Sequence, residues 1–93
     1  MNISKWNYMR NYSSDNYGAH SIAMNIGNVT LWWSYDTVIA FSTGYPVVVS
    51  ENNWGPTTGK HLNAINDDHS TRLPRGKFEK ELTKCLKKHK LEI

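Results

Sequence analysis

The sequence predicts an α+β domain in which an antiparallel meander sheet of four to five strands is followed by two C-terminal helices packed on one face. Apolar side chains alternate with a period of two through residues 20 to 51, and turn-forming residues interrupt this alternation at short intervals. Beyond residue 55 the apolar spacing changes to that of amphipathic helices. A chain of 93 residues is long enough for one core, so residues 1 to 93 are expected to form a single domain.

Residues 1 to 19 are predicted to form an aromatic and polar arm or an edge strand. Trp6, Tyr8 and Tyr12 occur at even spacing, with a lysine and an arginine interleaved. Aromatic rings combined with cations form stacking platforms for unpaired bases. These three residues are therefore candidates for stacking, and the alternative is that their rings belong to the core.

The meander, at residues 20 to 51, contains three predicted turns. They are expected at residues 27–28, 35–36 and 42–44, and the third leads into a strand at residues 45 to 51. Trp32 and Trp33 are adjacent in one strand, so their side chains point to opposite sides of it. One of the two tryptophans then lies on the less covered face, and Trp32 joins the stacking candidates.

Residues 56 to 66 are predicted to form a short helix with Thr57 as its N-cap. The preceding loop lacks the spacing of a Walker A loop, because three residues separate its glycines and His61 stands where a hydroxyl is needed. Nucleotide hydrolysis is therefore excluded. A helix start still offers unpaired backbone amides, so a candidate site for a phosphate or carboxylate consists of Thr57, Thr58, Lys60 and His61. The alternative is a capped helix with a solvated Lys60.

Residues 74 to 91 are predicted to form a second, basic amphipathic helix, with Pro74 at its first position. Its apolar stripe includes Phe78, Leu82 and Cys85 at helical spacing. Cys85 is the single cysteine of the chain and is expected to be a buried small hydrophobe.

Positive charge is concentrated around this helix. Residues 72 to 90 hold eight basic and two acidic side chains, a balance of +6, whereas the rest of the chain holds three basic and six acidic ones, a balance of −3. Most of these cations fall opposite the apolar stripe, where they can contact nucleic acid or an acidic protein surface. The candidate binding residues are Arg72, Arg75, Lys77, Lys80, Lys84, Lys87 and Lys88. The alternative is an ordinary solvated helix face.

The histidines lack the spacing of catalytic and metal-binding motifs. We therefore expect a non-enzymatic protein without a metal or another cofactor. A small metal-dependent nuclease that uses His61 or His69 with Asp67 is retained as an alternative, because folding can bring distant residues together.

The chain is expected to be soluble and cytoplasmic. Its apolar runs are far shorter than the roughly 18 residues of a membrane span, and its N-terminal residues lack the pattern of a secretory signal. No contact with membranes is expected. A small meander of this kind has edge strands, and we expect that it can self-associate through one of them.

Two runs of the sequence carry a family resemblance. They are Ser34-Tyr35-Asp36-Thr37-Val38-Ile39-Ala40 and Asn53-Trp54-Gly55-Pro56-Thr57-Thr58-Gly59-Lys60-His61-Leu62. The region around them, residues 30 to 66, resembles a family of small uncharacterised proteins of phages and other mobile elements. The recurring features are a Ser-Tyr-x-Thr turn that enters a strand and a Thr-Thr-x-x-His helix start. Both fit structural roles, and the resemblance identifies no catalytic residue.

The resemblance implies an accessory protein that acts on host machinery in the host cytoplasm, as anti-CRISPR and other anti-defence inhibitors do. Together with the basic segment, it predicts a non-enzymatic inhibitor or modulator. Its basic surface would engage nucleic acid, or a host effector protein or ribonucleoprotein. The alternatives are a protein that sequesters a phosphorylated small ligand at the Thr57 helix start, and the small nuclease described above.

Overall fold

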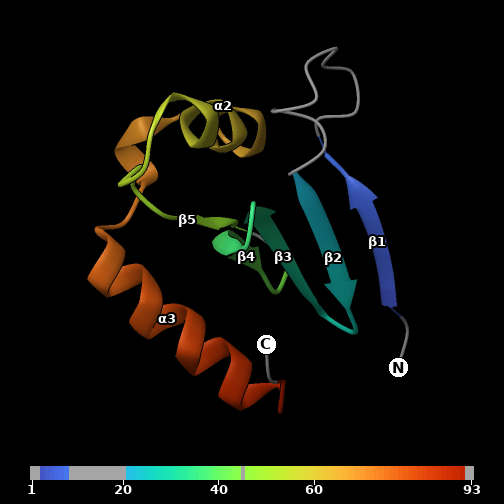
Figure 1. Cartoon of the computed structure of the whole chain (residues 1–93). Coiled ribbons are helices and arrows are strands. Elements are labelled where there is room, and N and C mark those ends of the chain that lie inside the picture. Colours follow the sequence, from blue (N-terminus) through green and yellow to red (C-terminus); the bar gives the residue numbers. More distant parts are fainter. Residues whose placement is uncertain (1–2, 9–20, 45, 92–93) are drawn as a thin grey trace.

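The computed structural model of the chain describes residues 3–8, 21–44 and 46–91. These residues form β1 (Ile3–Asn7), β2 (Ile22–Ile26), β3 (Val29–Ser34), β4 (Thr37–Ser42), β5 (Val48–Val49), α2 (Pro56–Ile65), the 3-10 turn η1 (His69–Thr71) and α3 (Arg75–Lys88) (Figure 1). The five strands form one sheet in the order β1-β2-β3-β4-β5, and each strand is antiparallel to its neighbours. This arrangement confirms the predicted α+β meander followed by two helices.

Turns between the strands follow the predicted positions. Gly27 takes a left-handed φ of 60° in the β2–β3 turn, where a glycine has no Cβ to clash. Tyr35 takes a φ of 56° in the β3–β4 turn. The last strand is shorter than the predicted span of residues 45 to 51: Ser50 still donates its N–H to the carbonyl of Ile39 in β4 at 3.0 Å, and beyond Ser50 the chain leaves β4. Glu51 donates its backbone N–H to the carbonyl of Leu73 at 2.8 Å, so this segment pairs with the approach to α3 instead.

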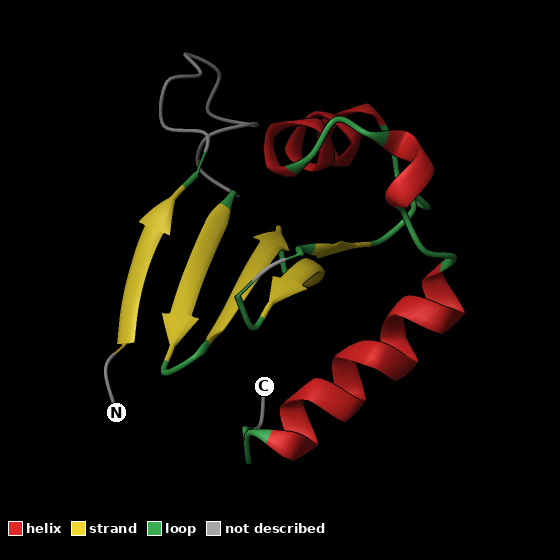
Figure 2. Cartoon of the chain, turned by 180° about the vertical axis from the view of Figure 1, so that it is seen from behind, coloured by secondary structure: helices red, strands yellow, loops and turns green. Residues whose placement is uncertain are grey.

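The two helices lie on opposite faces of the sheet, whereas the sequence predicted that they share one face (Figures 1 and 2). Cross-strand partners show the division: Leu31 pairs with Phe41 and packs with α3, whereas Trp32 pairs with Ala40 and packs with α2. The cause is β4, in which residues 38 to 41 are all buried. A strand that is apolar on both sides requires cover on both sides.

A β-bulge at Trp32 and Trp33 shifts the register between β3 and β4. The two rings nevertheless lie on opposite faces, as predicted: Trp33 packs against the cluster that α3 covers, and Trp32 packs against the cluster that α2 covers. The sheet therefore separates two small cores, one under each helix.

The helix boundaries differ from the predicted ones for local reasons. Gly55 is the N-cap of α2 and Pro56 occupies its first turn, so the prediction of Thr57 as N-cap is wrong. The fixed φ of a proline suits the first helical position, so α2 begins at Pro56, one residue before Thr57. At its C-terminus, α3 ends at Lys88 because Lys90 adopts a φ of 56° and Leu91 donates its N–H back to the carbonyl of Leu86 at 2.8 Å.

Candidate functional site

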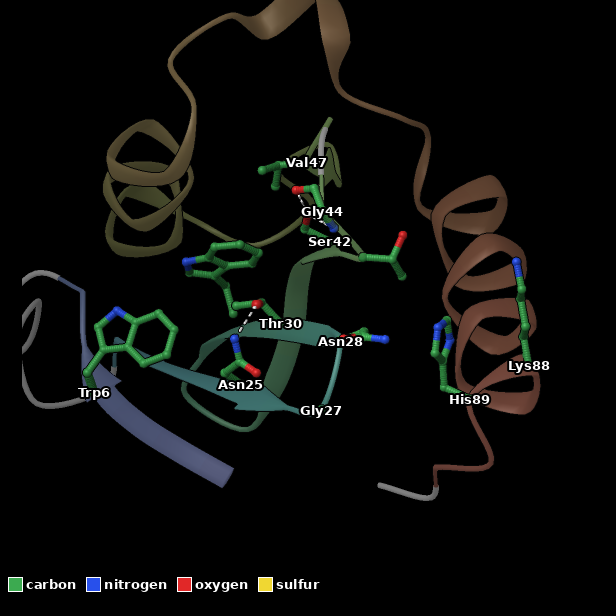
Figure 3. Close-up of a pocket in the computed structure, with 12 residues that line it drawn as sticks. Trp6, Asn25, Gly27, Asn28, Thr30, Ser42, Gly44, Val47, Lys88 and His89 are labelled. Atoms are coloured by element: carbon green, nitrogen blue, oxygen red, sulfur yellow. Dashed lines mark hydrogen bonds between the residues drawn. The ribbon is translucent and has the colours of Figure 1, made fainter. Parts of the chain in front are cut away.

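A groove of about 640 Å³ opens on the sheet face that also carries α2 (Figure 3). Its floor comes from β1, β2 and β3, and its far wall comes from the C-terminal end of α3. We call it the tryptophan groove, because Trp6 and Trp32 both line it. It brings together residues from the first strand and the last helix.

A row of cross-strand partners explains the aromatic part of this groove. Trp6 pairs with Ala23, and Ala23 pairs with Trp32, so all three side chains lie on the same face. Ala23 is fully buried and does not line the groove, so the space above it is filled and the aromatic part of the groove surface is formed by the two tryptophans themselves. Two strand spacings place the Cα atoms of the tryptophans about 10 Å apart. Trp6 is 41% exposed, so much of its ring is available for contact.

The next row along the same face is polar. Asn25 pairs with Thr30, and Thr30 pairs with Ser42. The Asn25 side-chain amide donates to the Thr30 hydroxyl at 3.3 Å, and the Ser42 hydroxyl accepts from the Gly44 N–H at 3.1 Å (Figure 3). Amide and hydroxyl groups thus lie beside the aromatic row, where they can orient a bound ligand.

Lys88 and His89 form the opposite wall of the tryptophan groove (Figure 3). His89 caps α3, and its Nδ1 lies 2.9 Å from the carbonyl oxygen of Cys85. Because a carbonyl oxygen only accepts hydrogen bonds, Nδ1 is the nitrogen that carries the proton in this contact. The other ring nitrogen, Nε2, takes no part in it. The ammonium group of Lys88 supplies a positive charge on this side.

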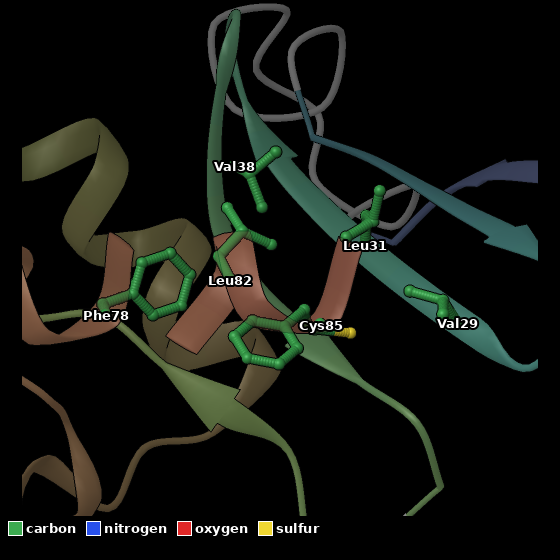
Figure 4. Close-up of a cluster of buried hydrophobic side chains, with 7 residues drawn as sticks. Val29, Leu31, Val38, Phe78, Leu82 and Cys85 are labelled. Carbon is green, nitrogen blue, oxygen red and sulfur yellow. The ribbon is translucent and has the colours of Figure 1, made fainter. Parts of the chain in front are cut away.

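Buried side chains of α3 hold the helix against the other face of the sheet. Phe78, Leu82 and Cys85 are buried in one cluster with residues of β3 and β4 (Figure 4). The rings of Phe41 and Phe78 are 5.6 Å apart at their centroids, a usual distance for an aromatic pair. Burial raises the pKa of the Cys85 thiol, so this cysteine is a packing residue and not a reactive thiolate.

The opposite side of α3 presents a row of exposed lysines. We call it the lysine face, and it consists of Lys77, Lys80, Lys84, Lys87 and Lys88. Among the residues that the structure describes, Arg75 and Glu79 form an ion pair, and none of these five lysines takes part in it. Five positive charges on one solvated helix face form a surface that favours anionic partners.

The two predicted arginine contacts have structural roles. Arg75 donates from Nη1 to the carbonyl oxygen of Val38 at 2.9 Å and from Nε to Glu79 at 3.0 Å. Its guanidinium group also lies over the rings of Trp54 and Phe78, at 5.0 and 4.9 Å from their centroids. Arg75 therefore connects the start of α3 to β4.

Arg72 connects the segment before α3 to α2. Its Nη2 donates to the side-chain oxygen of Asn63 at 2.8 Å and to the carbonyl oxygen of Asn66 at 3.2 Å. Its side chain is half-buried, which separates it from the lysine face. Arg72 and Arg75 are thus held by the fold, whereas the five lysines extend into solvent.

Ser34, Thr58 and His61 form a buried polar network between β3 and α2. The Ser34 hydroxyl oxygen lies 2.7 Å from His61 Nδ1 and 3.0 Å from the Thr58 hydroxyl oxygen. All three side chains are buried, and His61 is 0% exposed. The two segments that carry the family resemblance meet at this network, where a set of mutual hydrogen bonds joins α2 to the sheet.

The predicted anion site at the start of α2 is not assembled as one exposed surface. Thr58 and His61 point inward to Ser34, whereas Lys60 is exposed and Thr57 is half-buried. A phosphate at the helix start would therefore lack two of the four predicted contacts.

The stacking candidates separate in the same way. Trp6 and Trp32 line the tryptophan groove, whereas Tyr12 lies outside the described residues. Tyr8 turns inward: its hydroxyl donates to the carbonyl oxygen of Trp33 at 2.7 Å, and its ring meets His61 edge-on at a centroid distance of 6.0 Å. Burial raises the pKa of Tyr8 above its usual range.

Sequence reasoning missed the polar residues of the groove, including Asn25, Asn28 and Thr30. They contribute to it because the meander places β2 and β3 side by side with this register. For β3 the available signal was the alternation itself, since Thr30 and Trp32 alternate with the buried Val29 and Leu31; Asn25 has the parity of the buried Ala23, so alternation could not mark it as a groove residue.

The residues of the predicted nuclease alternative are divided: Asp67 and His69 lie at η1, whereas His61 is buried in α2 against Ser34. His69 Nε2 is 3.0 Å from the side-chain oxygen of Asn63, and Asp68 caps η1 by accepting from the N–H of Ser70 at 3.1 Å. Hydrogen bonds from Ser70 lower the pKa of Asp68. Within the described ranges, no group of three or more His, Cys, Asp or Glu side chains is placed to hold a metal ion.

None of the helices in the described part of the chain has the length and apolarity needed to cross a membrane.

Residues 3–80 match a family of unknown function, DUF8033, so the chain belongs to that family. The match covers the sheet, α2 and the first part of α3. Neither the curated proteins nor the solved structures contain a significant match to this chain.

Proposed function

We propose that this member of the DUF8033 family is a non-enzymatic binding protein whose lysine face engages nucleic acid or a nucleic-acid-binding effector protein. The observation that carries the proposal is the division of α3 into two sides. One side is anchored in the core by Phe78, Leu82 and Cys85, and the other presents five exposed lysines. A rigid helix with a solvated cationic side suits a polyanion or a strongly acidic protein surface.

The dimensions of α3 support this proposal. Lys77 and Lys88 are eleven positions apart, which corresponds to about 16 Å along the helix axis. Lys80, Lys84 and Lys87 lie between them at helical spacings of four and three residues, so they share one side. Several phosphates along a strand can therefore be contacted at the same time without a change in the fold.

In the wider biological setting, we place the protein in a phage or another mobile element, acting in the host cytoplasm on host machinery such as a CRISPR or other defence complex. The support is the small size of the domain, its concentrated positive charge and the resemblance of its Ser-Tyr-x-Thr and Thr-Thr-x-x-His segments to small phage proteins. Binding to such a complex would block its nucleic-acid or protein contacts in a stoichiometric manner.

The test is a pair of double variants with the same change in net charge. Lys84→Glu/Lys87→Glu reverses two charges of the lysine face, and Lys5→Glu/Lys60→Glu reverses two exposed lysines elsewhere. Binding to fluorescently labelled DNA and RNA, single-stranded and duplex, is measured by anisotropy at low salt. We expect the first variant to lose roughly tenfold or more in affinity and the second to lose much less. Equal losses would show that net charge, and not the lysine face, governs binding.

A further inference from the structure

We infer that the tryptophan groove accepts unpaired bases of a single-stranded nucleic acid whose backbone follows the lysine face. This inference rests on the proposed function and names its ligand class. It assigns a role to Trp6 and Trp32, which the lysine face does not use.

The aromatic row offers a base a ring face at the groove. Trp6 and Trp32 lie on either side of the buried Ala23, about 10 Å apart between Cα atoms, and both line the groove, so a base that enters it can stack on an indole face. Trp6 is 41% exposed although it is a large aromatic residue, and an exposed aromatic at the edge of a groove marks a contact surface. Stacking tolerates any base, because every base has a flat aromatic face.

Polar side chains supply the second element of base recognition. Asn25 and Thr30 lie in the row next to the tryptophans, and Asn28 lies at the turn that closes the groove (Figure 3). Asparagine amides offer both donors and acceptors, which match the edges of an unpaired base. In a duplex these edges are paired and the faces are stacked, so the groove discriminates against duplex nucleic acid.

Lys88 connects the groove to the lysine face. It lines the tryptophan groove, and it also lines an adjoining hollow of about 220 Å³ together with Lys84. A strand that follows α3 toward its C-terminus therefore reaches the groove past Lys84 and Lys88; Glu81 lines the same hollow, and the net charge of these three side chains is positive. This charge favours a polyanion as the occupant over a neutral sugar, which would also stack on tryptophan.

The test uses tryptophan variants of the full chain and a short labelled single strand, with a blunt duplex of the same length as comparison. Trp6→Leu removes one ring and keeps an apolar side chain on β1, and Trp6→Phe retains an aromatic ring. We expect Trp6→Leu to weaken single-strand binding by roughly 5- to 150-fold, the range of one lost stacking contact, and Trp6→Phe to restore most of it. Duplex binding should change little.

The matched control is Trp54→Leu, because Trp54 is 44% exposed but lies outside the groove. Trp54→Leu should keep single-strand affinity within about twofold of the unaltered chain. Trp32→Leu repeats the test from the other side, with a thermal melt to show that its partly buried position still folds.

The outcomes separate the two proposals. If Trp6→Leu and folded Trp32→Leu bind the single strand as tightly as the unaltered chain does, while Lys84→Glu/Lys87→Glu does not, the groove inference is overturned and the lysine face stands. If the unaltered chain prefers the duplex, the groove inference also fails. If it binds neither nucleic acid, a nucleic-acid role for the lysine face fails together with the inference.

Discussion

The buried network of Ser34, Thr58 and His61 leads to a quantitative prediction about stability. Ser34→Ala removes the hydroxyl oxygen that lies 2.7 Å from His61 Nδ1 and 3.0 Å from the Thr58 hydroxyl. Each hydrogen bond contributes about 1 kcal/mol net, and a buried polar group that loses its partner costs about 1–3 kcal/mol. Because some of these groups retain other contacts, we expect a total loss of about 2–4 kcal/mol in the free energy of unfolding.

This loss is a large part of the roughly 5–15 kcal/mol that stabilises a typical domain. For a domain of this size, it corresponds to a decrease in Tm of roughly 10 to 30 °C. The assay is urea unfolding followed by far-ultraviolet circular dichroism, together with a thermal melt.

The matched control is Ser50→Ala. Ser50 is also fully buried, but its hydroxyl makes one hydrogen bond of 2.9 Å to the neighbouring Glu51 carbonyl oxygen. We expect this variant to lose about 1 kcal/mol. If Ser34→Ala costs no more than Ser50→Ala, the network does not join α2 to the sheet, and the reasoning from its geometry is refuted.

Two further predictions concern residues that the structure places in the fold. Tyr8→Phe removes the hydrogen bond to the Trp33 carbonyl oxygen, at a cost of about 1–3 kcal/mol below pH 10. Because burial raises the pKa of Tyr8, the unfolded chain loses this proton first as pH rises above about 10, so the stabilisation that Tyr8 provides decreases there. The gap between the urea midpoints of Tyr8→Phe and the unaltered chain should therefore narrow above pH 10, and a constant gap would contradict the burial argument. Arg75→Lys keeps the charge but loses the forked contacts to Val38 and Glu79, so it should lower stability by about 1–2 kcal/mol and leave nucleic-acid affinity nearly unchanged. If this variant lost nucleic-acid affinity without losing stability, Arg75 would be a binding residue and not a structural one.

Local patterns made the sheet and the helices predictable. Period-two alternation and turn residues indicated the meander, and the stripe of Phe78, Leu82 and Cys85 indicated which side of α3 is buried. The placement of α2 and α3 on opposite faces was not predicted, although the continuous apolar run at residues 38 to 41 carries that information.

The candidate site was predictable only where one element contains all of it. The lysine face lies within α3, so helical spacing was sufficient to predict it. The fate of Thr58 and His61 depends on Ser34, and Ser34 and His61 are 27 positions apart. The tryptophan groove depends on the register of three strands, which sets Trp6 and Trp32 in one row. Such long-range pairings leave no mark in local spacing.

The most direct test of the lysine face is the salt dependence of single-strand binding. Each phosphate contact of a single strand contributes about −0.7 to the slope of log K against log salt, so four or five lysine contacts predict a slope of about −3. Lys84→Gln/Lys87→Gln should reduce the magnitude of this slope by about 1.4. A slope near zero for the unaltered chain, or the same slope in both proteins, would contradict an electrostatic role of the lysine face.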